Sequence, residues 1–154
     1  MSGPSKAAIR VGEAVRAEPL AMVQTLTASG MSAETLAFLE RSAELLQQAC
    51  TDTASSEAAL EEWARQYRAV RAALGQCRRV ADRRRLARVA ARLGTQLGVL
   101  LWELDELVAA LAYFDASVVA AEEADDRVLG AWVAEHRASK TAGNAGRWGP
   151  TAAS

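Results

Sequence analysis

Cysteine, histidine and proline are all scarce in this chain of 154 residues. The two cysteines, Cys50 and Cys77, show no CxxC spacing, and the single histidine is His136. We therefore expect no disulfide framework, no zinc site and no histidine-dependent catalytic triad. Glycine-rich phosphate loops and the HExxH and GxSxG patterns of hydrolases are also missing from the sequence. We accordingly predict that the protein is not an enzyme and uses neither a cofactor nor a bound metal.

Long apolar runs and an excess of one charge are lacking as well. No apolar run approaches the roughly 18 residues of a membrane span, and the first 20 or so residues lack the apolar core of a secretory signal. The formal net charge is −1, so no overall field draws the molecule to nucleic acid or to an anionic membrane. We therefore expect a soluble, cytoplasmic protein without membrane association.

The residues that are abundant favour helices. Alanine occupies about 35 positions, 51% of the chain is hydrophobic, and there are only 10 glycines and 3 prolines. Alanine is the strongest helix former, while glycine and proline are the weakest. The length suits one domain with a single sizeable core. We predict an all-α fold.

Apolar residues that recur in steps of three and four predict five helices. Ser32 is expected to cap the first helix, and Gly75 is expected to end the second in a left-handed conformation. Short connections between the helices imply antiparallel hairpins. The expected helices cover about residues 33–50, 56–74, 80–104, 106–124 and 127–138.

The remaining segments have no comparable periodicity. Around the helical domain we expect a weakly helical leader and, because the last residues contain glycine and serine without a period, a disordered tail. Gly94 and Gly98 lie one turn apart inside the third helix, where they are unfavourable. We therefore expect a close approach of the next helix, with Gly98 facing Ala110. The predicted segments are residues 1–31, 32–138 and 139–154.

Residues 91–124 fit a tetratricopeptide repeat (TPR), whose length is about 34 residues. Leu97 and Gly98 match its Leu-Gly pair, and Ala110 and Phe114 match its small and aromatic positions. Over about residues 20–138, the chain resembles the TPR-like region of actinobacterial Xre-type transcriptional regulators. The resemblance implies a right-handed array of about five helices that acts as a regulatory interaction module. The helix-turn-helix of those regulators has no counterpart here, so we do not expect direct DNA binding.

Two groups of side chains are candidates for partner binding. Arginines crowd the start of the third helix from Arg78 to Arg92, and their guanidinium groups suit carboxylates or phosphates. Three further residues follow the inner face of the first helix of the repeat, which lines the peptide groove in TPR proteins. The candidates are Arg85, Arg88, Arg92, Thr95, Val99 and Trp102.

Three functions stay open at this stage. The leading hypothesis is a non-enzymatic module that binds a protein or peptide. The first alternative is a helical domain that senses a small-molecule effector, and the second is nucleic-acid backbone binding through the arginine cluster. The arginines also fit a solvated face that pairs with nearby acidic residues.

We further expect a homodimer, because an incomplete array leaves apolar flanks uncovered. The flanks in question are the stripes of the first two helices and, in the last helix, Trp132 and Val133.

Overall fold

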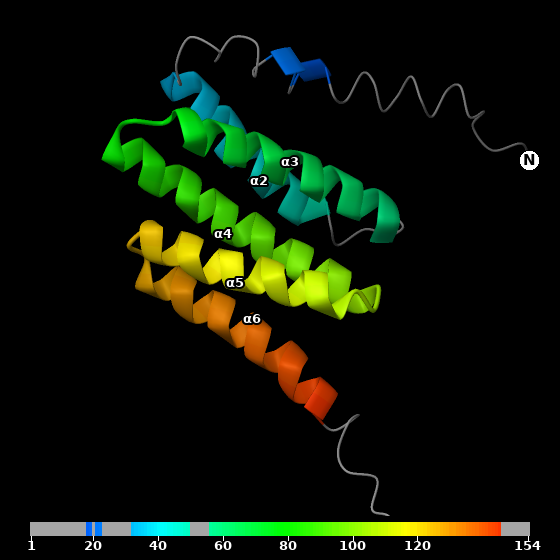
Figure 1. Cartoon of the computed structure of the whole chain (residues 1–154). Helices are drawn as coiled ribbons and strands as arrows, with labels where there is room; N and C mark the ends of the chain where they lie inside the picture. Colours follow the sequence, from blue (N-terminus) through cyan, green and yellow to red (C-terminus); the bar gives the residue numbers. More distant parts are fainter. Residues whose placement is uncertain (1–17, 20, 23–31, 50–55, 146–154) are drawn as a thin grey trace, which may run out of the picture.

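The computed structural model describes residues 18, 19, 21, 22, 32–49 and 56–145. Within these residues the chain is helical with short turns and contains no strand, which confirms the predicted all-α fold (Figure 1). The leader predicted for residues 1–31 lies almost entirely outside the described residues, as does Cys50. After the helical residues near position 20, the helices are α2 (Ala33–Ala49), α3 (Ser56–Gln76), α4 (Val80–Glu103), α5 (Leu107–Glu123) and α6 (Arg127–Ala145).

The helices form an array in which each packs against the next, and α4 touches all the others (Figure 1). Figure 1 shows the relative direction of the helices, and ion pairs that join non-consecutive helices agree with it. Arg85 near the start of α4 reaches Glu40 in α2, while Glu103 at the end of α4 faces Lys140 near the end of α6. Consequently α2, α4 and α6 run in the same direction along the array, and α3 and α5 run in the opposite one.

Side-chain oxygens cap two of the helices. The backbone N–H of Thr35 donates to Oγ of Ser32 at 3.2 Å, which confirms the predicted cap of α2. Hydrogen bonds from its own backbone N–H and from Ser32 lower the pKa of Glu34 in the same turn. At the start of α6, the Leu129 N–H donates to Oδ1 of Asp126 at 3.0 Å. Both caps satisfy amides that have no partner inside the helix.

The turns after α4 and α5 share one backbone pattern. Asp105 has φ of 64° and Asp125 has φ of 54°, both in the left-handed region. Around Asp105, the amides of residues 105 and 106 bond to the carbonyls of Trp102 and Leu101, and the amides of residues 125 and 126 repeat the pattern. This is the Schellman motif, with aspartate at the position that glycine usually occupies.

The end of α3 differs from the prediction. Gly75 is not a left-handed cap, because it lies within the last turn of the helix, which continues to Gln76. The Cys77 amide bonds to the Leu74 carbonyl at 3.4 Å, so the chain leaves the helix without needing a positive φ.

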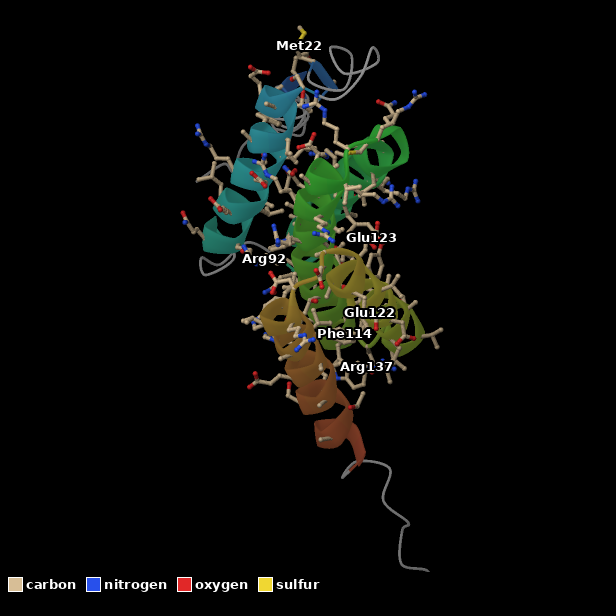
Figure 2. The ribbon with its side chains drawn as sticks, turned by 90° about the vertical axis from the view of Figure 1, so that its left-hand side faces the viewer. Met22, Arg92, Phe114, Glu122, Glu123 and Arg137 are labelled. Carbon is tan, nitrogen blue, oxygen red and sulfur yellow. The ribbon has the colours of Figure 1, made fainter. Side chains whose placement is uncertain are left out.

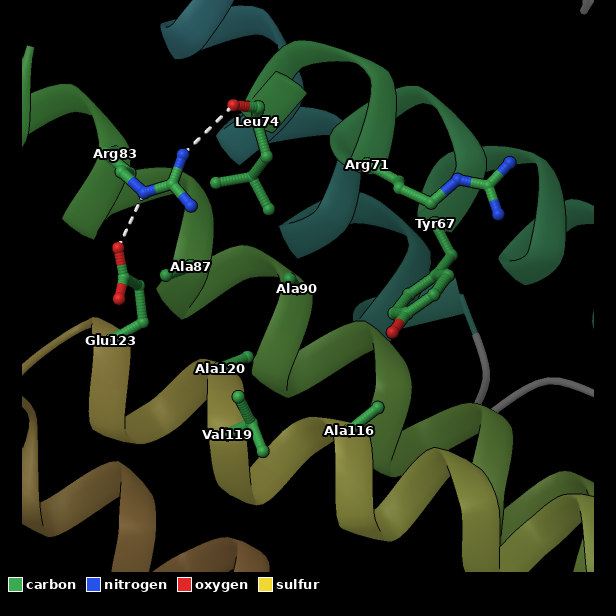
Figure 3. Close-up of a pocket in the computed structure, with 10 residues that line it drawn as sticks. All are labelled: Tyr67, Arg71, Leu74, Arg83, Ala87, Ala90, Ala116, Val119, Ala120 and Glu123. Carbon is green, nitrogen blue, oxygen red and sulfur yellow. Dashed lines mark hydrogen bonds and ion pairs between the residues drawn. The ribbon is translucent and has the colours of Figure 1, made fainter. Parts of the chain in front are cut away.

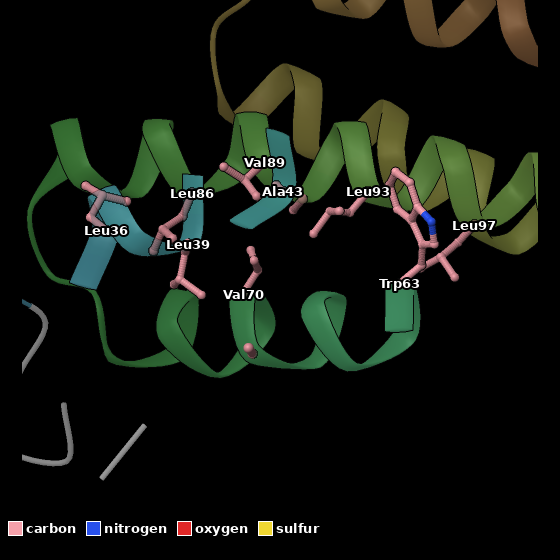
Figure 4. Close-up of a cluster of buried hydrophobic side chains, with 11 residues drawn as sticks. Leu36, Leu39, Ala43, Trp63, Val70, Leu86, Val89, Leu93 and Leu97 are labelled. Carbon is pink, nitrogen blue, oxygen red and sulfur yellow. The ribbon is translucent and has the colours of Figure 1, made fainter. Parts of the chain in front are cut away.

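The main core lies where α2, α3 and α4 meet (Figure 4). Trp63 of α3 is its largest fully buried side chain. The stripes of the first two predicted helices therefore cover one another and α4, and Val133 is also fully buried, packed with residues of α4 and α5. The uncovered flanks on which the homodimer expectation rested are thus mostly filled within one chain. The core comprises Leu36, Leu39, Ala43, Trp63, Ala69, Val70, Leu86, Val89, Ala90, Leu93 and Leu97.

Two glycines let α4 and α5 approach closely, as predicted, but with different neighbours. A Cβ atom on Gly98 would lie 2.8 Å from the buried ring of Phe114. The neighbour of Gly98 is therefore Phe114 and not Ala110, which the sequence predicted. A Cβ atom on Gly94 would collide with Oγ of Ser117 and lie 3.2 Å from the Tyr67 ring. Glycine at these positions makes room for two aromatic rings.

The last helix is longer than expected. It begins at Arg127, as predicted, but continues to Ala145 instead of ending near Ala138. The extension includes small polar residues. Among them, Oγ1 of Thr141 donates to the Arg137 carbonyl at 3.0 Å. The Lys140 ammonium lies 3.8 Å from the Glu103 carboxylate, so this extension also contacts α4.

Candidate interaction face

The arginines at the start of α4 mostly face carboxylates of neighbouring helices. Arg83 Nε donates to Glu123 Oε1 at 2.6 Å, and Arg84 lies 3.8 Å from Asp125. These partners belong to the end of α5 and the turn that follows it. The pairing agrees with the simpler interpretation of the cluster, in which arginines answer nearby acidic residues.

Arg85 and Arg88 join α4 to helices on either side. Arg85 forms a two-pronged contact with Glu40 of α2, with N···O distances of 2.9 and 2.6 Å, and hydrogen bonding to this carboxylate raises the pKa of Arg85. Arg88 Nε lies 3.3 Å from Asp126. The Leu129 amide is the main cause that lowers the pKa of Asp126, and the charge of Arg88 acts in the same direction.

Arg92 is different, because it is exposed and forms no ion pair with the part of the chain that the structure describes. It lies between the end of α2 and the beginning of α6 (Figure 2). There it borders an open pocket of about 380 Å³. The pocket is lined by Gln47 of α2, Arg92 of α4, and Asp126, Val128, Leu129 and Trp132 at and after the start of α6.

Apolar surface adjoins this guanidinium. Val128 is 83% exposed, and Trp132 is only partly buried. The Trp132 ring stacks at a tilt on His136, with 4.3 Å between ring centroids, and His136 Nδ1 lies 2.9 Å from the Trp132 carbonyl. His136 is thus half-buried and packed against the indole. We call the surface formed by Gln47, Arg92, Val128, Leu129 and Trp132 the Arg92 face.

The six candidate residues do not form one site. Only Arg92 lines the pocket, while Arg85 and Arg88 flank it in ion pairs. Thr95 was expected on an accessible inner face, but it is fully buried and its Oγ1 donates to the Ala91 carbonyl at 2.7 Å. That part of the prediction is wrong, since a buried hydroxyl bonded to its own helix cannot meet a partner.

Val99 and Trp102 lie toward the other end of α4. They pack against the cluster of Leu101, Ala110 and Phe114 and are only partly exposed. Their distance along the helix from Arg92 separates them from the pocket. The indole that lines the pocket is Trp132, which the sequence analysis named only as part of the uncovered flank of the last helix.

Gln47, Val128 and Leu129 were missed altogether. For Gln47, the signal is the alignment of parallel helices. Once Glu40 pairs with Arg85, the residue seven positions later in α2 faces the residue seven positions later in α4, which brings Gln47 beside Arg92.

The described residues contain no cluster of three or more histidine, cysteine or acidic side chains that is arranged to hold a metal ion. None of the helices formed by these residues has the length and apolar character required to cross a membrane. Comparisons of the chain with protein-family models, with curated proteins and with solved structures find no match.

Proposed function

We propose that the protein is a non-enzymatic, cytoplasmic interaction module of the kind found in transcriptional regulators, and that it binds a protein or peptide segment at the Arg92 face. The observation that carries the proposal is an unpaired guanidinium beside exposed apolar surface. Arg83, Arg84, Arg85 and Arg88 all lie within 4 Å of carboxylates, and Arg92 alone of the arginines along this part of α4 stays open to a ligand.

The arrangement of helices supports this assignment. Helices α2, α4 and α6 run parallel and together line the pocket, while α3 and α5 pack elsewhere. Alternate helices also line the peptide groove in TPR proteins, to which residues 91–124 bear a resemblance. A partner that offers a carboxylate to Arg92 and an apolar side chain to Val128 and Trp132 would match the chemistry of this face.

Selection from a displayed peptide library on the full-length chain tests the proposal. We expect enrichment of peptides that combine acidic and apolar residues, and we expect Arg92→Glu to weaken their binding at least about tenfold. The matched control is Arg84→Glu, which makes the same charge change in the same helix outside the pocket. It should alter affinity less than about twofold.

Two outcomes would contradict the proposal. One is equal weakening by the two charge reversals, which would indicate a response to net charge alone. The other is a selection that enriches no acidic and apolar sequences. Circular dichroism of both variants checks that the helices are intact.

Nucleic-acid binding through the arginine cluster is less well supported. Four of its guanidinium groups already contact carboxylates, and binding phosphate there would break these contacts. A phosphate binder must lose affinity steeply as salt rises. We expect no such salt-dependent binding to duplex DNA.

A homodimer remains part of the proposal, now supported by a different surface. Val108 is 86% exposed on α5, and the exposed Ala112 lies one turn later on the same side of the helix. Association of two α5 helices would remove this apolar stripe from water. We expect sedimentation equilibrium to report a dimer at tens of micromolar. We also expect Val108→Glu to convert it to a monomer, and a wild-type chain that stays monomeric would refute the expectation.

A further inference from the structure

A second hollow lies in the molecule, away from the Arg92 face. It is a groove of about 260 Å³ between α3 and α5, with α4 as its floor (Figure 3). Leu74 comes from α3, Ala87 and Ala90 from α4, and Val119 and Ala120 from α5. Apart from its two ends, the groove is therefore apolar. Its volume equals about nine water molecules at about 30 Å³ each, which suits an occupant of about ten non-hydrogen atoms.

One end of the groove carries two unused hydrogen-bond donors. Tyr67 and Arg71 are one turn apart on α3, and both border the groove (Figure 3). Among the described residues, neither the Tyr67 hydroxyl nor the Arg71 guanidinium has a hydrogen-bond or ion-pair partner. Burial raises the pKa of Tyr67, with Tyr113 acting in the same direction, while the charge of Arg71 opposes the shift. The phenol therefore remains a proton donor at neutral pH.

The Tyr67 ring is firmly placed. It meets the Tyr113 ring edge to face, with 5.3 Å between centroids. Gly94 also lies beside the ring, where a Cβ atom would be 3.2 Å from it. The hydroxyl is thus presented from a packed ring, which reduces the entropy lost when it binds a ligand.

At the opposite end of the groove, the positive charge is already paired with a carboxylate. Arg83 donates to Glu123 at 2.6 Å and to the Leu74 carbonyl at 3.2 Å (Figure 3). Its guanidinium is therefore occupied, and Glu123, the one carboxylate among the described residues that line the groove, is paired. The unsatisfied positive charge lies at the Tyr67 and Arg71 end, which gives the groove a direction.

We propose that this groove binds a small monocarboxylic acid, with the carboxylate at Tyr67 and Arg71 and a compact apolar body on the alanine floor. Charge complementarity identifies the anionic group, and the volume and apolar walls identify the rest. The site is separate from the Arg92 face and does not depend on the function proposed for that face. It gives a specific form to the small-molecule alternative that the sequence left open.

Phenylacetate, which has ten non-hydrogen atoms, is a suitable probe for the full-length chain. Its neutral analogue phenylacetamide and the cation phenethylamine have nearly the same shape. Amide chemical shifts followed by NMR during titration should move saturably at the groove for phenylacetate. We expect phenylacetamide to bind at least about tenfold more weakly, and phenethylamine not to bind.

Matched variants distinguish the parts of the site. Arg71→Gln should weaken the binding of phenylacetate about tenfold. Arg68→Gln, a control one turn away and outside the groove, should bind phenylacetate with near wild-type affinity. Ala116→Leu should fill the groove and abolish binding. Ala134→Leu places the same side chain at an exposed position of α6, outside the groove, and should have no effect.

Several results would overturn this proposal. Equal affinity for phenylacetate and phenylacetamide would show that the negative charge of the ligand is not recognised. Equal effects of the two leucine variants would place the ligand elsewhere, and shifts that stay linear to high concentration would show non-specific contact. None of these outcomes bears on peptide selection at the Arg92 face, so the two proposals fail independently.

Discussion

The Gly98→Leu variant is expected to unfold at a clearly lower urea concentration than the wild-type chain. A Cβ atom at this position would already lie 2.8 Å from the ring of Phe114, which is fully buried. The rest of a leucine side chain must then push α4 and α5 apart. Overpacking of this kind costs about 1–3 kcal/mol, and a leucine in place of glycine lies at the upper end of that range.

A glycine in open space provides the control. Gly130 lies inside α6, and nothing within 4 Å would meet its Cβ atom. Gly130→Ala should therefore stabilise the protein by about 0.4–1 kcal/mol, since alanine is the better helix former. The two substitutions differ in sign. A Gly98→Leu variant as stable as the wild type would refute the close packing of α4 against α5.

Trp63→Ala is expected to cause the largest loss of stability of any substitution considered. Its side chain is fully buried among residues of α2, α3 and α4, beside Leu93 and Leu97 (Figure 4). Removing a buried tryptophan costs about 3–5 kcal/mol through lost transfer free energy and the cavity that remains. That is a large share of the 5–15 kcal/mol or so that stabilises a typical domain. Urea unfolding followed by circular dichroism measures the change.

Two further substitutions keep this prediction testable if the alanine variant does not fold. Trp63→Phe retains most of the apolar contact and should cost markedly less. Trp102→Ala removes the same side chain from a partly exposed position and should also cost less. A Trp63→Ala loss no greater than that of Trp102→Ala would mean that the α3–α4 contact is not the main core.

Most helix boundaries could be predicted because they depend on local chemistry. The Ser32 cap and the start of α6 after Asp126 involve residues only three positions apart. The end of α6 was missed because residues 139–145 have no apolar period, and the contact that this segment makes with α4, between Lys140 and Glu103, joins residues far apart in the sequence. The prediction for Gly75 failed although its signal was local. A glycine near a helix end favours a left-handed cap but does not require one.

The candidate site was less predictable, because it depends on how distant helices align. The arginine run was visible in the sequence, but whether each guanidinium is free is decided by Glu40, Glu123 and the turn after α5. The TPR register also placed Thr95 on an accessible face, whereas the rotation of α4 directs it into the core. A helical period specifies which residues share a face. It does not specify which neighbour covers that face.

The paired Schellman turns after α4 and α5 also restrict how this array can move. Each turn passes through a single left-handed aspartate, Asp105 or Asp125, and is closed by two backbone hydrogen bonds. With so little slack, α4, α5 and α6 cannot slide along one another by a helical turn without breaking those bonds. A change of tilt between these helices would leave the hydrogen bonds of the turns intact. Because α4 contributes to both the Arg92 face and the α3–α5 groove, such tilting would alter both surfaces at once, and any coupling between their ligands would be reciprocal.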